Sequence, residues 1–270
     1  MVKSNFHTHT NLTDGRNEAE DMILAAIEAG FDTLGFSEHA YVPFDPDYSL
    51  TPETTLFYRS EIARLKAKYA DKINIICGVE MDYYSEDDVE KYDYAIGSVH
   101  YIKVCGRTYS VDLSADETIA CVKESFGGNL DGYAECYFEH VADVKRKTGA
   151  DIIGHFDLIT KFAEKGVVFD TESPRYQRAW KAAMQELAQK TPFEINTGAV
   201  ARGYRSSPYP APDMLEELKK MNGMVIISSD CHAKTQIDFG LADAAEYAKS
   251  KGFVSGGFTD KKGILHKQEF

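Results

Sequence analysis

The sequence lacks any long apolar segment. No apolar run in the 270 residues approaches the roughly 20 residues needed to span a bilayer, and residues 1–7 contain no apolar signal segment. A CxxC pair is also missing, and the five cysteines are widely spaced, which fits reduced thiols better than disulfides or a zinc ribbon. We therefore expect a cytoplasmic protein with no membrane segment.

Positive charge is scarce as well. The chain has 30 lysine and arginine residues against 43 acidic ones, a formal net charge of −13. This balance opposes binding of a long nucleic acid and favours a small-molecule substrate. If that substrate is itself anionic, bound metal ions are a suitable source of local positive charge. The sequence does not reveal the oligomeric state.

No repeat, low-complexity stretch or Ser/Gly linker divides the chain, so we expect residues 1–270 to form a single domain. Short apolar runs alternate with amphipathic stretches, which is typical of an α/β domain with a parallel sheet. Strands are predicted at residues 2–6, 33–36, 73–79, 94–99, 151–154, 193–196 and 224–228, with a weaker pattern at 253–258. Helices are predicted from Asn17, with Glu20 completing a capping box, to Gly30, and over residues 53–69, 131–147, 175–190, 213–221 and 241–251.

Side chains that can bind metals come directly after the predicted strands. In barrels of parallel strands, the carboxyl ends of the strands meet on one face, where active sites are built. Distant segments would therefore deliver these side chains to one place. In chain order they are His7 and His9, His39, Glu80, His100, His155, and finally Asp230 and His232.

Each element taken alone also has a simple structural explanation. His7 and His9 would point to the same side of an extended strand, but such pairs also occur by chance, and Asp14 lies in a turn-like stretch. Six of the eight histidines nevertheless follow the C-terminal end of a predicted strand, which favours a metal centre. His140 and His266 are expected to be structural or exposed. Imidazole and carboxylate ligands suit Zn, Fe or Mn.

With these residues in place, the sequence resembles the polymerase and histidinol phosphatase (PHP) superfamily. The resemblance rests on His7-Thr8-His9, Ser37-Glu38-His39, Gly97-Ser98-Val99-His100 and Asp230-Cys231-His232. It implies a distorted (β/α)7 TIM-like barrel with a trinuclear metal site at the C-terminal ends of the strands. The implied ligands are His7, His9, Glu80 and Asp230 for the first metal, Glu80, His100 and His155 for the second, and Asp14, His39 and His232 for the third.

Residues 154–162 and 194–198, followed by Arg202, resemble members that hydrolyse L-histidinol phosphate to L-histidinol and phosphate in histidine biosynthesis. A phosphate monoester dianion repels hydroxide, so catalysis needs a pre-formed nucleophile and cations over the phosphoryl oxygens. We expect a metal-bridged hydroxide to attack phosphorus, with Glu80, Asp230 and His232 as the catalytic residues. Either Asp230 or His232 would help to protonate the leaving group.

Arg16, Lys161 and Arg202 are candidates for binding the phosphate, because each lies a few residues beyond a strand end. Tyr101, with Tyr41 and Tyr204, could supply aromatic walls for the rest of the substrate. Two other readings stay open at this point: a phosphomonoesterase, phosphodiesterase or exonuclease acting on another small substrate, and a metal-binding module without activity.

Overall fold

The computed structural model describes residues 2–270 and is built around a sheet of seven strands in the order β1-β2-β3-β4-β7-β8-β9. All neighbouring strands in it pair in parallel. The strands are β1 (Ser4–Asn5), β2 (Thr33–Phe36), β3 (Asn74–Asp82), β4 (Tyr94–Ser98), β7 (Ile152–Ile153), β8 (Phe193–Asn196) and β9 (Val225–Ser228). The predicted α/β barrel class and the positions of its seven strands are confirmed.

The sheet curls into a nearly closed barrel, and β1 and β9 meet just past their carboxyl ends. There the backbone N–H of His9 donates to the carbonyl of Cys231 (3.0 Å), and the N–H of Cys231 donates to the carbonyl of His7 (3.3 Å). Nearer their amino ends the side chain of Gln268 spans the seam. It accepts a hydrogen bond from the N–H of Ile227 (2.7 Å) and donates to the carbonyls of Ile227 (2.8 Å) and Ser4 (3.3 Å).

Tyr94 fills the middle of the barrel. Its hydroxyl donates to the carbonyls of Phe6 and Phe36 on the two strands opposite. Gly35 and Gly78 make room for this ring, since a Cβ atom at either position would lie within 2.4 Å or 2.2 Å of it. The side chains that pack together inside the barrel are Phe6, Ile76, Tyr94, Ile96, Ile152, Ile226 and Phe258.

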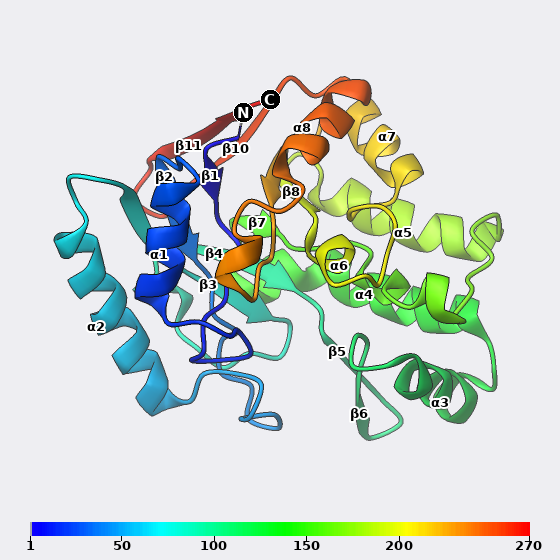
Figure 1. Cartoon of the computed structure of the whole chain (residues 1–270). Helices are drawn as coiled ribbons and strands as arrows, with labels where there is room; N and C mark the ends of the chain where they lie inside the picture. Colours follow the sequence, from blue (N-terminus) through cyan, green and yellow to red (C-terminus); the bar gives the residue numbers. More distant parts are fainter. Residues whose placement is uncertain (1) are drawn as a thin grey trace.

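Helices cover the outside of the barrel, as Figure 1 shows. The longer ones are α1 (Ala19–Glu28), α2 (Pro52–Lys68), α4 (Leu130–Thr148), α5 (Pro174–Leu187), α7 (Pro212–Lys220) and α8 (Leu241–Ser250). Proline stands at the start of α2, α5 and α7, where its missing N–H costs no helical hydrogen bond. The short ones are α6 (Gly198–Ala201) and the 3-10 helices Val89–Lys91, Leu158–Thr160, Ala163–Lys165 and Lys234–Gln236. In residues 2–270 no helix combines the length and apolar character needed to cross a membrane.

The predicted start of the first helix was wrong. Helix α1 has Glu18 at its N-cap, and no side chain caps it. The side chain of Asn17 instead accepts a hydrogen bond from the N–H of Lys234 (2.9 Å), and Glu20 accepts one from Lys68 of α2. These long-range contacts override the local capping signal.

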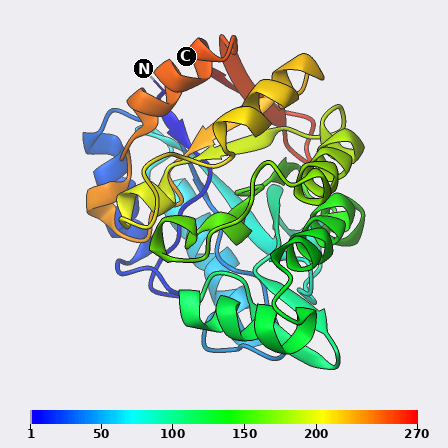
Figure 2. The ribbon, with the colours of Figure 1, turned by 90° about the vertical axis from the view of Figure 1, so that its right-hand side faces the viewer.

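Two antiparallel hairpins lie outside the predicted pattern. Strands β5 (Tyr101–Val104) and β6 (Arg107–Ser110), followed by α3 (Ala115–Phe126), form an insertion between β4 and α4, at the lower edge of Figures 1 and 2. Strands β10 (Ser255–Thr259) and β11 (Leu265–Glu269) pair only with each other. The weak strand pattern at 253–258 is therefore β10, which adds Phe258 to the side chains packed inside the barrel but does not add an eighth strand to the sheet.

Candidate metal centre

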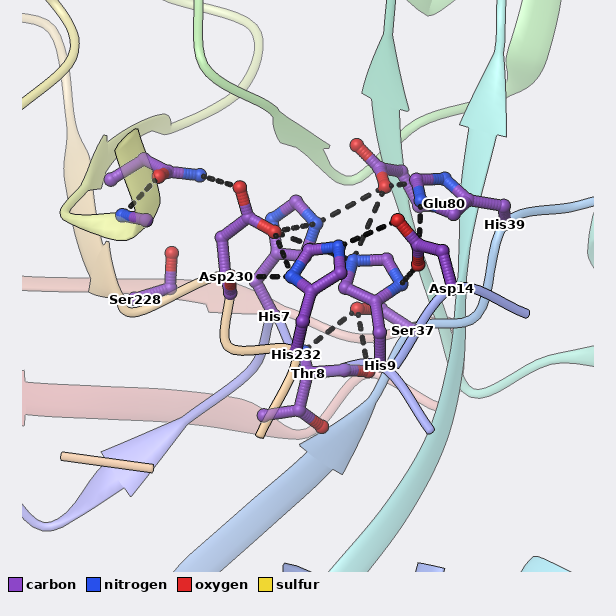
Figure 3. A network of polar contacts seen from close by, with 12 residues as sticks. His7, Thr8, His9, Asp14, Ser37, His39, Glu80, Ser228, Asp230 and His232 are labelled. Carbon is purple, nitrogen blue, oxygen red and sulfur yellow. Dashed lines mark hydrogen bonds and ion pairs between the residues drawn. The ribbon is translucent and has the colours of Figure 1, made fainter. Parts of the chain in front are cut away.

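The nine predicted metal ligands lie together at the carboxyl ends of the barrel strands, Glu80 within β3 and the others beyond a strand end. Figure 3 shows His7, Asp230 and His232 facing Glu80, His39 and Asp14 across a small space, with His9 between them. Four groups in this cluster have donor atoms close enough together to hold a metal ion: His9, Asp14, His39 and His232; His7, His155 and Asp230; His7, His9 and Glu80; and His39, Glu80 and His100.

The segment His7-Thr8-His9 places both imidazoles on the same side, as its spacing predicts. His7 and His9 both point into the cluster and are fully buried. Thr8, between them, points the other way and joins β1 to β2: its hydroxyl donates to the carbonyl of Gly35 (2.8 Å), and its carbonyl accepts the N–H of Ser37 (3.0 Å). These two hydrogen bonds of Thr8 hold the end of the strand in place and thereby position the imidazoles on either side of it.

Glu80, two residues before the end of β3, lies between two sets of histidines. Its Oε2 is 3.2 Å from Nε2 of His7 and 3.0 Å from Nδ1 of His39. Its Oε1 is 3.0 Å from Nε2 of His155 and 3.4 Å from Nε2 of His100. A carboxylate whose two oxygens face different ligand sets is suited to bridging two metal ions.

A further group forms at the mouth of the cluster. Asp14 is 2.9 Å from Nε2 of His232 and 3.5 Å from Nε2 of His39, and its side chain is 32% exposed, far more than Glu80 at 1%. The Asp14 loop is held by the buried carboxylate of Glu38, which accepts hydrogen bonds from the N–H of Thr10 (2.8 Å) and from the Thr13 hydroxyl. This group is the most accessible part of the cluster.

The cluster leaves an unusual number of buried polar atoms without a hydrogen bond. Within residues 2–270, these atoms include Nε2 of His7, both ring nitrogens of His9, Nε2 of His39, Nδ1 of His100 and of His155, and Oε2 of Glu80. Buried polar groups in proteins are nearly always satisfied, and a metal ion accepts lone pairs from such nitrogens and carboxylates. The residues present therefore fit a group of bound divalent metals.

Charges in the cluster shift its pKa values in opposite directions. Burial, with two neighbouring histidines, lowers the pKa of His9 to about 3. For His39, burial acts in the same direction, but nearby carboxylates outweigh it and raise the pKa to about 9. Burial tends to raise the pKa of Glu80, but the surrounding histidines outweigh it and hold that pKa well below its usual range. Mutually perturbed groups of this kind are typical of functional sites.

Glu194 is a buried carboxylate behind the cluster that the sequence analysis did not assign. It lies 2.6 Å from Nδ1 of His7, accepts the backbone N–H of His155 (3.0 Å) and accepts a hydrogen bond from Asn196 (2.9 Å). By holding Nδ1, it leaves Nε2 of His7 directed at Glu80. The available signal was a charged residue inside the apolar strand β8, since Glu194 is only 1% exposed.

Asp230 has a backbone conformation that non-glycine residues rarely adopt, with φ of 46°. Such strain often accompanies function. Gly198 leaves room for the Asp230 side chain in this conformation, because a Cβ at position 198 would come within 2.8 Å of an Asp230 carboxylate oxygen. Arg202, which directly follows α6, donates to that carboxylate (3.1 Å) and to the backbone carbonyl of Asp230 (2.8 Å).

A cavity of about 290 Å³ opens onto the cluster. Of the residues predicted to contact the substrate, Lys161, Arg202, Tyr101 and Tyr204 line it. Arg16 and Tyr41 do not line it; the Arg16 side chain is exposed, and only its N–H reaches the cluster, donating to the carbonyl of His232 (2.7 Å). Other lining residues that we had not assigned are Asp45, Tyr48, Ser110, Asp112, Leu113 and Leu158.

Cys231, His140 and His266 are not among the proposed metal ligands. Cys231 is buried, which raises the pKa of its thiol to about 12. His140 contacts the Tyr84 hydroxyl (2.7 Å) and the carbonyl of Cys136 (2.7 Å). His266 is buried against Asp260 (2.9 Å). Both histidines have structural roles, as expected.

Comparison with known proteins agrees with this geometry. The family model for the PHP domain matches residues 5–198, which is more than half of the chain. This chain belongs to the PHP family. The matched region contains His7, His9, Glu80, His100 and His155, whereas Asp230 and His232 follow it.

Proteins named histidinol-phosphatase are similar to the chain over nearly its whole length. The one from Lactococcus lactis is 33% identical, with 94% of this chain and 93% of the relative aligned. The one from Bacillus subtilis is 25% identical, covering 88% and 97%. The crystal structure of histidinol phosphate phosphatase from Lactococcus lactis, complexed with zinc, L-histidinol and phosphate, has the same fold, with a TM-score of 0.73, 21% identity in the structural alignment and 98% of each chain covered.

Proposed function

We propose that this protein is a phosphoric monoester hydrolase that converts L-histidinol phosphate to L-histidinol and phosphate. The observation that carries the proposal is the buried cluster of histidines around Glu80, with metal-binding atoms left unsatisfied beneath a small cavity. The histidinol-phosphatases that align over almost the whole chain support the choice of substrate.

The proposal includes two or three divalent transition metals, of zinc, iron or manganese type. His7, His9, Glu80 and Asp230 would hold one of them, and Glu80, His100 and His155 a second. Asp14, His39 and His232 would hold a third. Bound there, the metals would neutralise phosphoryl oxygens and lower the pKa of a water molecule that attacks phosphorus.

Side chains around the cluster have separate tasks in this proposal. Arg202 holds Asp230 in its strained conformation and also lines the cavity, where its guanidinium can bind a phosphate oxygen. Lys161 lies on the same cavity and is paired with Asp112 (3.0 Å). Asp230 and His232, which border the cavity, are the candidates for delivering a proton to the leaving alkoxide.

We also propose a cytoplasmic location, because all five cysteines are free thiols, and such thiols are kept reduced in that compartment.

A steady-state screen of purified, metal-analysed protein tests this function. We expect kcat/KM for L-histidinol phosphate to exceed that for glycerol 3-phosphate, p-nitrophenyl phosphate and a dinucleotide by roughly 100-fold or more, a range that differential binding of one substrate can supply. Preference for the dinucleotide would favour a phosphodiesterase or exonuclease instead. Metal-replete protein without any turnover would favour a metal-binding module.

A further inference from the structure

One carboxylate in the cavity stands apart from the rest. Within residues 2–270, Asp45 has no lysine, arginine or histidine nitrogen within 4.0 Å, although it lines the cavity. Every other cavity carboxylate does have one: Asp14 with His232 (2.9 Å), Glu80 with His155 (3.0 Å), Asp112 with Lys161 (3.0 Å) and Asp230 with Arg202 (3.1 Å). An acid in a cavity with no cation beside it is available to a cation from outside the chain.

The Asp45 carboxylate is also held in place. Its Oδ2 accepts a hydrogen bond from the Tyr101 hydroxyl (2.7 Å), and the backbone carbonyl of Asp45 accepts one from the Ser49 hydroxyl (2.9 Å). No hydrogen bond within the described chain uses its Oδ1. Lys103, in β5, lies over the rings of Phe44 (4.5 Å) and Tyr84 (4.2 Å) and is not paired with Asp45.

An aromatic wall connects Asp45 to the metal centre. The Tyr48 ring packs against the His39 ring, with centroids 4.1 Å apart, and lies 6.3 Å from the Tyr101 ring. The Tyr48 and Tyr101 rings therefore lie between Asp45 and His39, a proposed metal ligand. A substrate whose phosphate lies at the metals would extend its alcohol part along this wall. In L-histidinol phosphate, the carbon next to the ester-bearing carbon carries an ammonium group.

We infer that Asp45 is a specificity-determining residue that accepts a hydrogen bond from the substrate ammonium group through its free oxygen, while the Tyr48 and Tyr101 rings flank the cation. This inference rests on the proposed function and adds to it the class of monoester that the cavity selects, one with a positively charged nitrogen close to the phosphate. Lys161 and Arg202, already paired with acids, line the same cavity and do not compete for Asp45.

The test is Asp45→Asn, which keeps an oxygen to accept from Tyr101 but removes the charge. Asp47→Asn is the matched control, because Asp47 is exposed on the same loop and does not line the cavity. The readout is kcat/KM for L-histidinol phosphate and for O-phosphoethanolamine, each divided by that for p-nitrophenyl phosphate on the same preparation. A partial loss of metal cancels from these ratios.

In Asp45→Asn we expect both ratios to fall by about 10- to 100-fold, the range for losing a hydrogen bond between charged groups. Asp47→Asn should keep the wild-type ratios. Unchanged ratios in Asp45→Asn would overturn the inference. A fall for L-histidinol phosphate without one for O-phosphoethanolamine would overturn the assignment to the ammonium group. If the wild-type protein itself shows no preference for L-histidinol phosphate, the proposed function fails, which is a different result.

Discussion

The two ends of the barrel both bury histidine and carboxylate side chains, but they satisfy them differently. At the amino end, His266 is paired with Asp260 (2.9 Å), and Gln268 makes hydrogen bonds to both strands at the seam. At the carboxyl end, Nε2 of His7 and both ring nitrogens of His9 have no hydrogen bond within residues 2–270. The comparison teaches that burial of a histidine alone does not mark a metal ligand, whereas a group of neighbouring buried imidazole nitrogens without hydrogen bonds does.

The largest expected effect comes from making the same substitution at each end. His155→Asn should lower kcat/KM for L-histidinol phosphate by more than about 100-fold, because it removes a proposed ligand beside Glu80. His266→Asn should leave kcat/KM unchanged and lower the free energy of unfolding by about 1–3 kcal/mol, since it disturbs a buried hydrogen bond. Steady-state kinetics and urea unfolding of both variants measure this; equal losses of activity would remove the distinction between the ends.

Glu194 extends the comparison to the residues behind the ligands. Glu194→Gln should weaken metal binding by roughly 10- to 100-fold, because an uncharged amide orients the His7 ring less strongly than the carboxylate does. Competition for zinc with a chromophoric chelator measures the affinity, and circular dichroism should show an intact fold. Wild-type zinc affinity in Glu194→Gln would show that Glu194 serves the core rather than the metal centre.

Metal binding at the carboxyl end should also depend on pH. In the metal-free protein, the pKa of His39 is about 9, and that of His7 is raised above its ordinary value because Glu194, Glu80 and Asp230 outweigh burial. Such imidazoles carry protons at pH 7 that a metal must displace, so affinity should rise with pH, about tenfold per unit for each proton displaced. Zinc titration calorimetry in two buffers of different ionisation enthalpy counts the protons released. Zinc binding without proton release would contradict these raised pKa values.

The smallest effect is expected at the seam. Gln268→Ala should lower the free energy of unfolding by about 1–3 kcal/mol, because it leaves buried backbone groups of Ile227 and Ser4 without partners. Zinc affinity and turnover should stay at wild-type values, since Gln268 spans the seam at the amino end of the barrel and the metal centre lies at the carboxyl end. Urea unfolding and zinc competition test this, and a loss of zinc affinity would show that the two ends are coupled.

Much of the barrel was predictable because most of its strands are short apolar runs that end just before the polar ligands, as β2 ends at Phe36 before His39. Strand β3 differs, because it continues past the predicted end at Val79 and contains Glu80. The positions of the ligands were predictable from the same strand ends. The hairpin β5–β6 was not predicted, because segments such as residues 107–110 are polar and lack the apolar signal of a strand. Of β10–β11, only β10 had a strand signal, and its pairing with β11 was not predicted. Contacts between distant residues, such as Glu194 with His7 or Asp45 with Tyr101, leave no local pattern in the sequence.

The most direct test of the central claim is to measure metal content and L-histidinol phosphate turnover on the same samples while a chelator removes the metal stepwise. Two or three metals per chain are predicted in the active protein, with turnover falling as they are removed and returning when zinc or manganese is added. The fold should persist throughout, because the core and the amino end of the barrel need no metal. Full turnover in metal-free protein would contradict the account.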